Sequence, residues 1–430
     1  MRFLVESGTY QIDNVGDIAM LQRTVWRLRE GFPGAAVAVV TERPERLKRA
    51  LPGVEPVAAS PWFRLRVVPV PRKWEYTPLV RRIRWREKLL AGRLPRVARA
   101  GKRMDRWAGR AERDAAEGFY QAVRAADAVV AAGGGYVNDF YHEHAWKVLA
   151  TLSLAQGLGK PTAMFGAGLG PVSRHDLVWH GGSVLRRLDL LALREAELGP
   201  AEARKLGVAD DRIVVTGDDA VAVAVAAQSA GPVETRHGIG VNLRLSADAE
   251  VPDEALPRVR VGVSEAARGR GAELVPLVVR TAQSPDNDVD AAARIFGQGG
   301  IDLSRAREIG SPQQALAEVA RCRVVVTGAY HNAVFALAMG VPVVGLGQSA
   351  YYGSKLSGVA RAFGTGMTVL SLDDPDLAGK LAREAARLWD EAPSLAAPLR
   401  AAAAAQAARG DAAYERFLRT CGPAGRRGAA

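Results

Sequence analysis

Residues 323–363 read RVVVTGAYHNAVFALAMGVPVVGLGQSAYYGSKLSGVARAF, and this stretch decides the fold. Its pattern predicts a buried strand at 324–327, a tight turn bearing His331, an apolar helix at 333–339 and a second buried strand at 341–346. Short β-branched runs that alternate with helical segments indicate a parallel sheet with crossover helices. Ligands of such sheets bind beyond the carboxyl ends of the strands, often at helix N-termini that favour anions. We therefore expect a functional site around His331.

The composition is that of a globular protein with more than one domain. At 430 residues the chain exceeds one ordinary core, and its hydrophobic content of 48% and charged content of 24% are typical of a folded soluble chain. Its apolar runs are too short to span a bilayer, and its N-terminus has the pattern of a strand rather than of a signal peptide. Two cysteines, Cys322 and Cys421, exclude a disulfide framework and a cysteine-rich metal site. We therefore expect a cytoplasmic protein.

The positive charge is concentrated in one segment. The chain carries a net charge of +12, and residues 81–113 hold 13 Lys and Arg against three acidic residues, a local net charge of +10. Because Trp85 and Trp107 lie within it, this segment can follow anionic lipid headgroups or a polyanionic substrate. An arginine-rich solvated helix is an equally good interpretation. No zinc finger, RNA-binding strand motif or basic zipper accompanies the segment, so specific nucleic-acid binding is the least favoured reading.

The chain divides into two βα series. The first opens with a strand at 2–6 and a turn at 14–17, where Asn14 can cap a helix at 18–29. This is the opening unit of a doubly wound fold, although it lacks the Gly-x-Gly-x-x-Gly fingerprint of dinucleotide binding. The second series begins at Gly238.

A polar segment with Pro and Gly at 224–237 has the composition of an interdomain linker. We therefore expect an N-terminal domain at 1–223 and a C-terminal domain at 238–430 that ends in two alanine-rich helices. Prolines interrupt the region at 66–113, which we interpret as an insertion or mobile flap in the N-terminal domain.

A run of three glycines follows the predicted strand at 127–132. The residues are Gly133, Gly134 and Gly135, with Tyr136 directly after them. Consecutive glycines at a strand end let backbone N–H groups approach a ligand, and a tight turn that needs positive φ is the structural alternative. A second glycine loop follows the predicted strand at 161–166. His142 and His144 further on are predicted to be loop residues and not metal ligands, because their spacing does not put them on one helix face.

Two cations fall at expected strand or loop ends. Arg194 ends a predicted strand at 189–194, where a fixed guanidinium suits a carboxylate or a phosphate. A salt bridge to Glu195 or Glu197 is the structural alternative. Lys355 begins a helix after a polar loop that starts at Gly345.

Short motifs along both halves of the chain occur in the order seen in the polysaccharide pyruvyl transferase family. The chain resembles that family over nearly its whole length except 66–113. The matching motifs are Asn14-Val15-Gly16-Asp17, Gly133-Gly134-Gly135, Gly168-Leu169-Gly170-Pro171, Leu193-Arg194-Glu195, Thr216-Gly217-Asp218, His331 followed by Phe335-Ala336-Leu337, Gly340-Val341-Pro342-Val343-Val344-Gly345, and Lys355. The resemblance implies an α/β fold of two Rossmann-like, doubly wound domains that face each other across a cleft, as in GT-B glycosyltransferases. It also implies an enzyme of polysaccharide biosynthesis at the cell envelope. Such an enzyme transfers pyruvate from phosphoenolpyruvate to two sugar hydroxyls, forms a cyclic ketal and releases phosphate, with no metal or cofactor.

The resemblance implies roles for particular residues on the two sides of the cleft. His331 is the acid/base candidate, because an imidazole titrates near neutrality. The donor is expected at His331, Arg194, Asn332, Gly345 and Lys355. The acceptor is expected at Asn14, Gly16, Asp17, Gly133, Gly134, Gly135 and Tyr136. Asp17 and Arg194 complete the catalytic set.

One position departs from the family pattern and keeps other functions open. Many members have arginine two residues before the histidine, where this chain has Ala329, so an obvious phosphate clamp is missing. A GT-B glycosyltransferase that uses a nucleotide sugar is one alternative, because backbone N–H groups alone can hold a diphosphate. A non-catalytic glycan- or membrane-binding protein is another, since fold does not guarantee activity. The leading hypothesis is a pyruvyl transferase acting on a sugar, glycan or lipid-linked sugar, with segment 81–113 resting on the inner face of the membrane.

Overall fold

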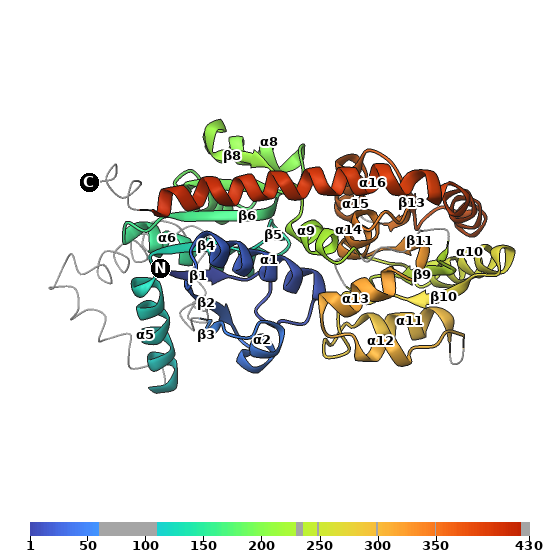
Figure 1. Cartoon of the computed structure of the whole chain (residues 1–430), viewed down its shortest axis with the longest axis horizontal. Helices are drawn as coiled ribbons and strands as arrows, with labels where there is room; N and C mark the ends of the chain where they lie inside the picture. Colours follow the sequence, from blue (N-terminus) through green and yellow to red (C-terminus); the bar gives the residue numbers. More distant parts are fainter. Residues whose placement is uncertain (60–109, 229–234, 247–248, 298–299, 349, 423–430) are drawn as a thin grey trace.

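The computed structural model describes residues 1–59, 110–228, 235–246, 249–297, 300–348 and 350–422. They form two α/β domains, each built on a parallel sheet (Figure 1). The predicted fold class is therefore confirmed. The predicted insertion at 66–113 and the basic segment at 81–113 lie, up to residue 109, outside the described residues.

The N-terminal sheet has the strand order β3-β2-β1-β4-β6-β7-β8, with β5 paired to β6, and its printed pairings are parallel. Its strands are β1 (Arg2–Glu6), β2 (Ala36–Thr41), β3 (Glu55–Ala58), β4 (Ala128–Ala131), β5 (Gly134–Val137), β6 (Thr162–Leu169), β7 (Leu190–Leu193) and β8 (Ile213–Val215). The helices of this half are α1 (Val15–Gly31), α2 (Pro44–Ala50), α5 (Arg110–Ala125), α6 (His142–Gly157), α7 (His175–Leu185), α8 (Leu198–Lys205) and α9 (Asp219–Ala226), with the short 3₁₀ helix η2 (Asp210–Arg212). The strands β4 and β7 are buried at every position because helices cover both faces of the sheet. The strands are added outward in one direction from β1 to β3 and in the other direction from β4 onward. The boundary between β1 and β4 is therefore the switch point where doubly wound sheets bind ligands.

The C-terminal sheet has the order β10-β9-β11-β12-β13 and is also parallel. Its strands are β9 (Gly238–Asn242), β10 (Glu273–Pro276), β11 (Cys322–Thr327), β12 (Val343–Gly347) and β13 (Met367–Ser371). Its helices are α10 (Ala255–Arg270), α11 (Asp288–Phe296), α12 (Ser304–Glu308), α13 (Pro312–Val319), α14 (Tyr330–Ala338) and α15 (Ala350–Phe363). The strand–helix–strand–helix order predicted for residues 323–363 is present.

Helix α14 begins earlier than predicted, so His331 lies in its first turn and not in a preceding loop. The reason is local. The Thr327 hydroxyl accepts a hydrogen bond from the Ala329 N–H at 2.9 Å, which turns the end of β11 directly into the helix. Helix α15 likewise begins at Ala350, before the predicted Lys355.

Several segments predicted to be loops have regular structure. Gly134 and Gly135 belong to β5, and Gly168 belongs to β6, because glycine can pair in a sheet when its neighbours need the space. The predicted loop residues His142 and His144 lie in the first turn of α6, where their rings meet the Asp139 and Ser7 carbonyls at 3.2 and 3.1 Å. The start of the predicted linker is the last turn of α9.

The chain ends its described part in one long helix, where two were predicted. Helix α16 (Leu377–Cys421) is 45 residues long and contains Pro393 and Pro398. Proline at 393 cannot donate to the Trp389 carbonyl, and the Arg323 guanidinium donates to that oxygen instead, at 2.9 Å. The missing backbone bond is thereby replaced, so the helix continues.

Helix α16 connects the two domains. It leaves the C-terminal half and runs back along the N-terminal sheet (Figure 1). There Tyr414 and Phe417 are buried in one apolar cluster with Phe165 of β6. A second apolar cluster also joins the halves, with Val15 of α1 packed among residues of α14. Part of the predicted C-terminal tail therefore stabilises the N-terminal domain, while the boundaries at 223 and 238 stay predictions.

Replacing Tyr414 with Phe is expected to lower the free energy of unfolding by about 1–3 kcal/mol, because it leaves a buried carboxylate without a donor. The Tyr414 hydroxyl donates to Asp219 at 2.7 Å and lies 2.9 Å from the Thr24 hydroxyl. Burial raises the pKa of Asp219 from 3.8 to about 7, whereas this hydrogen bond favours the charged form. The loss should therefore be larger at pH 8 than at pH 5.5, as measured by urea unfolding.

The control is Trp179→Phe on the exposed surface of α7, which should change the free energy of unfolding by less than about 0.5 kcal/mol. An equal loss at both pH values in Tyr414→Phe would show that the Asp219 charge does not depend on this hydroxyl.

Candidate functional site

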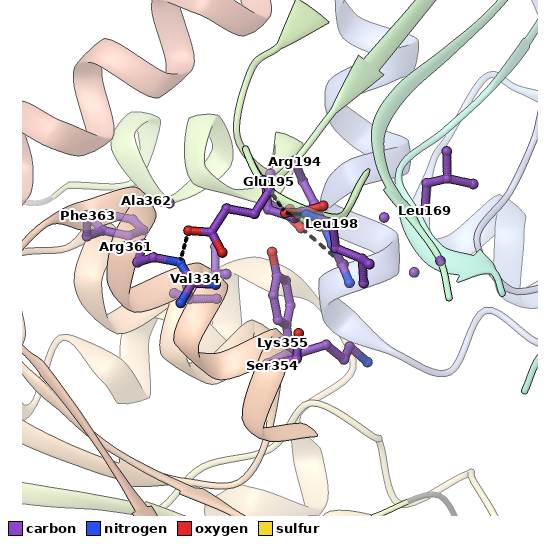
Figure 2. A pocket seen from close by; sticks show the side chains of 18 of the residues that line it. Leu169, Arg194, Glu195, Leu198, Val334, Ser354, Lys355, Arg361, Ala362 and Phe363 are labelled. Atoms are coloured by element: carbon purple, nitrogen blue, oxygen red, sulfur yellow. Dashed lines mark hydrogen bonds and ion pairs between the residues drawn. The ribbon is translucent and has the colours of Figure 1, made fainter. Parts of the chain in front are cut away.

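A cavity of about 80 Å³ lies between the two domains. The N-terminal half lines it with residues at or after the ends of β5, β6, β7 and β8, and the C-terminal half lines it with α14 and α15. Figure 2 shows Arg194 and Glu195 on one side of the cavity and Lys355 and Arg361 on the other. The cavity thus occupies the place where the carboxyl edge of the first sheet meets the second domain.

Arg194 is fixed in the wall of this cavity. It follows β7, and only 7% of its surface is exposed. Its Nη1 lies 3.6 Å from Oδ2 of Asp218, and its guanidinium carbon lies 4.0 Å from the centre of the Tyr330 ring. Charge attraction and the cation–π contact both hold the guanidinium plane in one orientation. Such a group recognises a carboxylate or a phosphate.

The two glycine motifs make room for this arginine. A β carbon on Gly135 would lie 2.5 Å from Nη2 of Arg194, and one on Gly168 would lie 2.8 Å from its Nε. Gly133 packs in the same way on Met20, and Gly134 has φ +151° beside the Tyr136 ring. The glycines predicted to touch the acceptor therefore have a visible structural task, and any ligand contact of theirs stays a prediction.

His331 lies beside the cavity on α14, with 7% of its surface exposed. A β carbon on Gly16 would lie 2.0 Å from its Cγ, so the imidazole packs directly on the first turn of α1. Burial lowers the pKa of His331 from 6.5 to about 4; Arg194 and Lys355 add to this, and Asp218 opposes it. The imidazole is therefore neutral at pH 7.

The first turn of α1 is held in place from both domains. The Asn14 side chain accepts hydrogen bonds from the N–H groups of Gly16 at 2.9 Å and Asp17 at 3.2 Å, which makes it the predicted helix cap. The Val15 N–H donates to the carbonyl of Val279 in the C-terminal domain at 2.9 Å. Gly16 and His331 are consequently held against each other by backbone contacts between the domains.

Asp17 is a second proton-transfer candidate in this turn. Although it is partly exposed, burial of its carboxyl raises the pKa from 3.8 to about 7; Arg280 opposes this shift, and Asp13 and Asp218 add to it. A carboxyl that titrates near neutrality suits general acid or base chemistry.

The remaining predicted residues lie at different distances from the cavity. Lys355 lines it from α15, with Nζ 6.0 Å from the Tyr330 ring centre. Asn332 is 1% exposed, and neither of its amide atoms has a hydrogen-bond partner among the described residues. Gly345 is buried within β12, and Tyr136 is a buried residue of β5 whose hydroxyl donates to a backbone carbonyl; neither is among the residues that line the cavity.

Sequence reasoning missed two residues of the site and misjudged a third. Asp218 and Tyr330 both line the cavity and contact Arg194. The signal for Asp218 was present, since its motif follows β8 at the same sheet edge as Arg194. Glu195, considered as a partner for Arg194, instead accepts hydrogen bonds from N–H groups at the start of α8. Glu197 pairs with Arg361 at 2.8 Å.

The arrangement places groups suited to anion binding beside groups suited to proton transfer. Arg194 and Lys355 supply positive charge, and His331 with Asp218 supplies an imidazole beside a carboxylate. No group of three His, Cys, Asp or Glu in the described part of the chain is placed to hold a metal ion. Within the same ranges, no helix has the length and apolar character needed to cross a membrane.

Two parallel-sheet α/β domains with a site between them define a GT-B-like protein, and solved structures of this fold match the chain. The UDP-GlcNAc 2-epimerase of Neisseria meningitidis bound to UDP-GlcNAc matches at 11% identity with a TM-score of 0.55, over 97% of this chain and 100% of that one. Anabaena Alr3699/HepE in complex with UDP matches at 12% identity with a TM-score of 0.52, over 98% and 99% of the two chains. Arabidopsis thaliana UGT89C1 complexed with UDP-L-rhamnose matches at 12% identity with a TM-score of 0.50, over 98% of each. At such identities the likeness shows the fold alone.

The family follows from the sequence. The model of the polysaccharide pyruvyl transferase family matches residues 14–349, which is most of the chain. The protein belongs to this family and is a transferase. No curated protein matches it.

Proposed function

We propose that the protein transfers pyruvate from phosphoenolpyruvate to two hydroxyls of a sugar, glycan or lipid-linked sugar, and so forms a ketal. The observation that supports this most is the buried Arg194, fixed by Asp218 and Tyr330 across the cavity from Lys355. Phosphoenolpyruvate carries a carboxylate and a phosphate, and two cations from opposite domains match two anionic groups on one small molecule.

The donor side is built around α14. Its N-terminus adds positive potential next to Tyr330 and His331, and the unpaired Asn332 amide offers a donor and an acceptor. These groups compensate for Ala329, which occupies the position of the usual family arginine. No cofactor takes part in this proposal.

The reaction requires proton transfer in two steps. In the first, C3 of the enol takes a proton while C2 bonds to a sugar hydroxyl oxygen, whose proton passes to a base. In the second, another hydroxyl oxygen bonds to C2 as the C–O bond to phosphate breaks. Its proton restores the acid that protonated C3, and the proton taken by the base in the first step leaves with the phosphate. His331 is suited to the acid role, because the neutral imidazole left after the first step can accept the second hydroxyl proton, and Asp17, with a pKa near 7, is suited to be the base on the acceptor side. Asn14 and Gly16 shape that side by fixing the first turn of α1.

The direct test is phosphate release from phosphoenolpyruvate in the presence of a panel of sugar and glycan acceptors. The expected result is acceptor-dependent phosphate release with a product that loses pyruvate in mild acid. Absence of release with every acceptor, together with tight UDP or GDP binding in a thermal-shift assay, would overturn the proposal.

That second outcome describes the alternative function, a nucleotide-sugar glycosyltransferase. Ala329 favours it, because a diphosphate needs no arginine when backbone N–H groups hold it. The GT-B-like neighbours in complex with UDP show that the fold accommodates such a ligand in those proteins.

Membrane contact is a separate part of the proposal. The local charge of +10 in segment 81–113 supports binding to anionic lipid at the cytoplasmic face, which would bring the enzyme to a lipid-linked acceptor. Co-sedimentation with vesicles that contain anionic lipid, and not with neutral vesicles, is the expected result.

A further inference from the structure

Asp218 occupies a turn that the surrounding structure fixes closely. It follows Gly217, whose φ is +96° and whose β carbon would lie 2.4 Å from Oε1 of Gln406 on α16. Asp218 then caps α9, because its Oδ1 accepts a hydrogen bond from the Ala220 N–H at 2.8 Å. Capping uses one carboxylate oxygen and leaves the other for a different task.

The second oxygen, Oδ2, faces the site. It lies 3.6 Å from Nη1 of Arg194 and 3.9 Å from Nε2 of His331, and only 2% of the side chain is exposed. Neither Oδ2 nor Nε2 has a hydrogen-bond partner within 3.5 Å among the described residues, and the Tyr330 side chain is the other group that faces the Asp218 carboxylate. A buried carboxylate oxygen is stabilised when it accepts a hydrogen bond from a charged donor. The pair is therefore arranged for a state in which a proton on Nε2 is shared with the carboxylate.

The charges around the imidazole decide when that state forms. Arg194 on β7 and Lys355 on α15 oppose a positive imidazole, and Asp218 on α9 favours it. Tyr330 precedes His331 on α14, with its ring edge-on at 5.3 Å, and Asp17 lies in the turn of α1 that the imidazole packs on. An anion bound between Arg194 and Lys355 would cancel the two opposing charges and leave Asp218 as the dominant influence.

We propose that an anionic ligand bound at Arg194 and Lys355 causes the uptake of one proton from solvent by Nε2 of His331, and that Asp218 is the positioning residue that stabilises the resulting imidazolium. The inference deepens the proposed function, on which it rests for the identity of the anion. Its consequence is that the site gains an acid only when the donor is present. The imidazolium then donates to a reacting atom or to the leaving phosphate, and returns to the neutral form when the anion leaves.

The test follows the His331 imidazole by NMR in protein labelled at histidine, of which the chain has six, with assignment by His331→Gln. Inorganic phosphate is the probe. In the wild type, phosphate is expected to raise the pKa of His331 by roughly one to three units, as an opposite charge within reach does. In Asp218→Asn the pKa of His331 with phosphate bound should lie roughly one unit or more below that of the wild type, because the carboxylate that favours the imidazolium is gone. Asp210→Asn, at an exposed pair with Arg204, is the matched control and should behave as the wild type.

Asparagine caps helices as well as aspartate, so Asp218→Asn removes the charge and keeps the cap. Because the variant also removes the carboxylate that faces the buried Arg194, its cooperative unfolding is measured alongside the titration to show that it is folded at the pH values used. A phosphate-bound pKa in Asp218→Asn equal to that of the wild type, or no rise with phosphate in the wild type, overturns the inference.

These outcomes are independent of pyruvyl transfer. Phosphate-linked protonation without turnover of phosphoenolpyruvate would support the inference while the proposed function fails. Turnover of phosphoenolpyruvate with the same acidic limb of the pH–rate profile in Asp218→Asn and the wild type would support the proposed function and contradict the inference.

Discussion

Replacing His331 with Ala is expected to lower kcat for phosphate release from phosphoenolpyruvate by about 10²–10⁴-fold, the usual contribution of a positioned acid or base. The imidazole is the acid/base group that faces both the first turn of α1 and the Asp218 carboxylate. The KM for phosphoenolpyruvate should change less, because Arg194 and Lys355 remain to bind it. Steady-state kinetics with a saturating acceptor measures both constants.

A second variant separates the position of His331 from its chemistry. Gly16→Ala keeps the histidine but places a β carbon 2.0 Å from its Cγ, so the imidazole must move. We expect a loss of kcat in the same direction. Gly118→Ala, in α5 with no atom within 4 Å of the new β carbon, is the matched control and should retain full activity. Full activity in Gly16→Ala would show that the present position of the imidazole does not matter for the reaction.

The alternation of β-branched and helical segments was sufficient to predict both sheets. Strands such as β4 and β11 are short and apolar throughout, which is a local property that the sequence displays directly. The single helix α16 was not predictable in this way, because its prolines argue locally for a break. Its continuity depends on Arg323, which reaches the Trp389 carbonyl from another element.

The candidate site likewise contains residues that the sequence pattern predicts and residues that only the packed structure reveals. Arg194, His331 and Lys355 were predicted together because each follows a strand at the carboxyl edge of a sheet. Asp218 and Tyr330 were not, since their importance lies in side-chain contacts between the two domains. The first glycine motif was interpreted as a ligand loop or a tight turn, and the second as a loop, although Gly135 and Gly168 lie in strands and leave the space that Arg194 fills. Backbone pattern locates the edge of a sheet, whereas the volume that a neighbour needs appears only in the packed structure.

Replacing Arg194 with Lys is expected to lower kcat/KM for phosphoenolpyruvate by about 10–10²-fold, even though the charge is kept. Lysine cannot offer the flat, paired N–H groups of a guanidinium, nor fill the plane between Gly135, Gly168 and the Tyr330 ring. Losing one charge-assisted hydrogen bond of about 1.5–3 kcal/mol accounts for a change of that size. Most of it should appear in KM, because the arginine is assigned to binding and not to proton transfer.

Two comparisons make this expectation specific. Arg204 lies on α8 and forms an exposed ion pair with Asp210. Arg204→Lys therefore makes the same chemical change away from the site and should leave kcat/KM unchanged. Gly168→Ala leaves the arginine in place but would put a β carbon 2.8 Å from its Nε, so it should raise KM in the same direction as Arg194→Lys. If Arg194→Lys kept the KM of the wild type while Gly168→Ala raised it, the backbone of β6 and not the guanidinium would hold the donor. If both kept it, the anion would bind elsewhere, and Lys355 would be the next residue to replace.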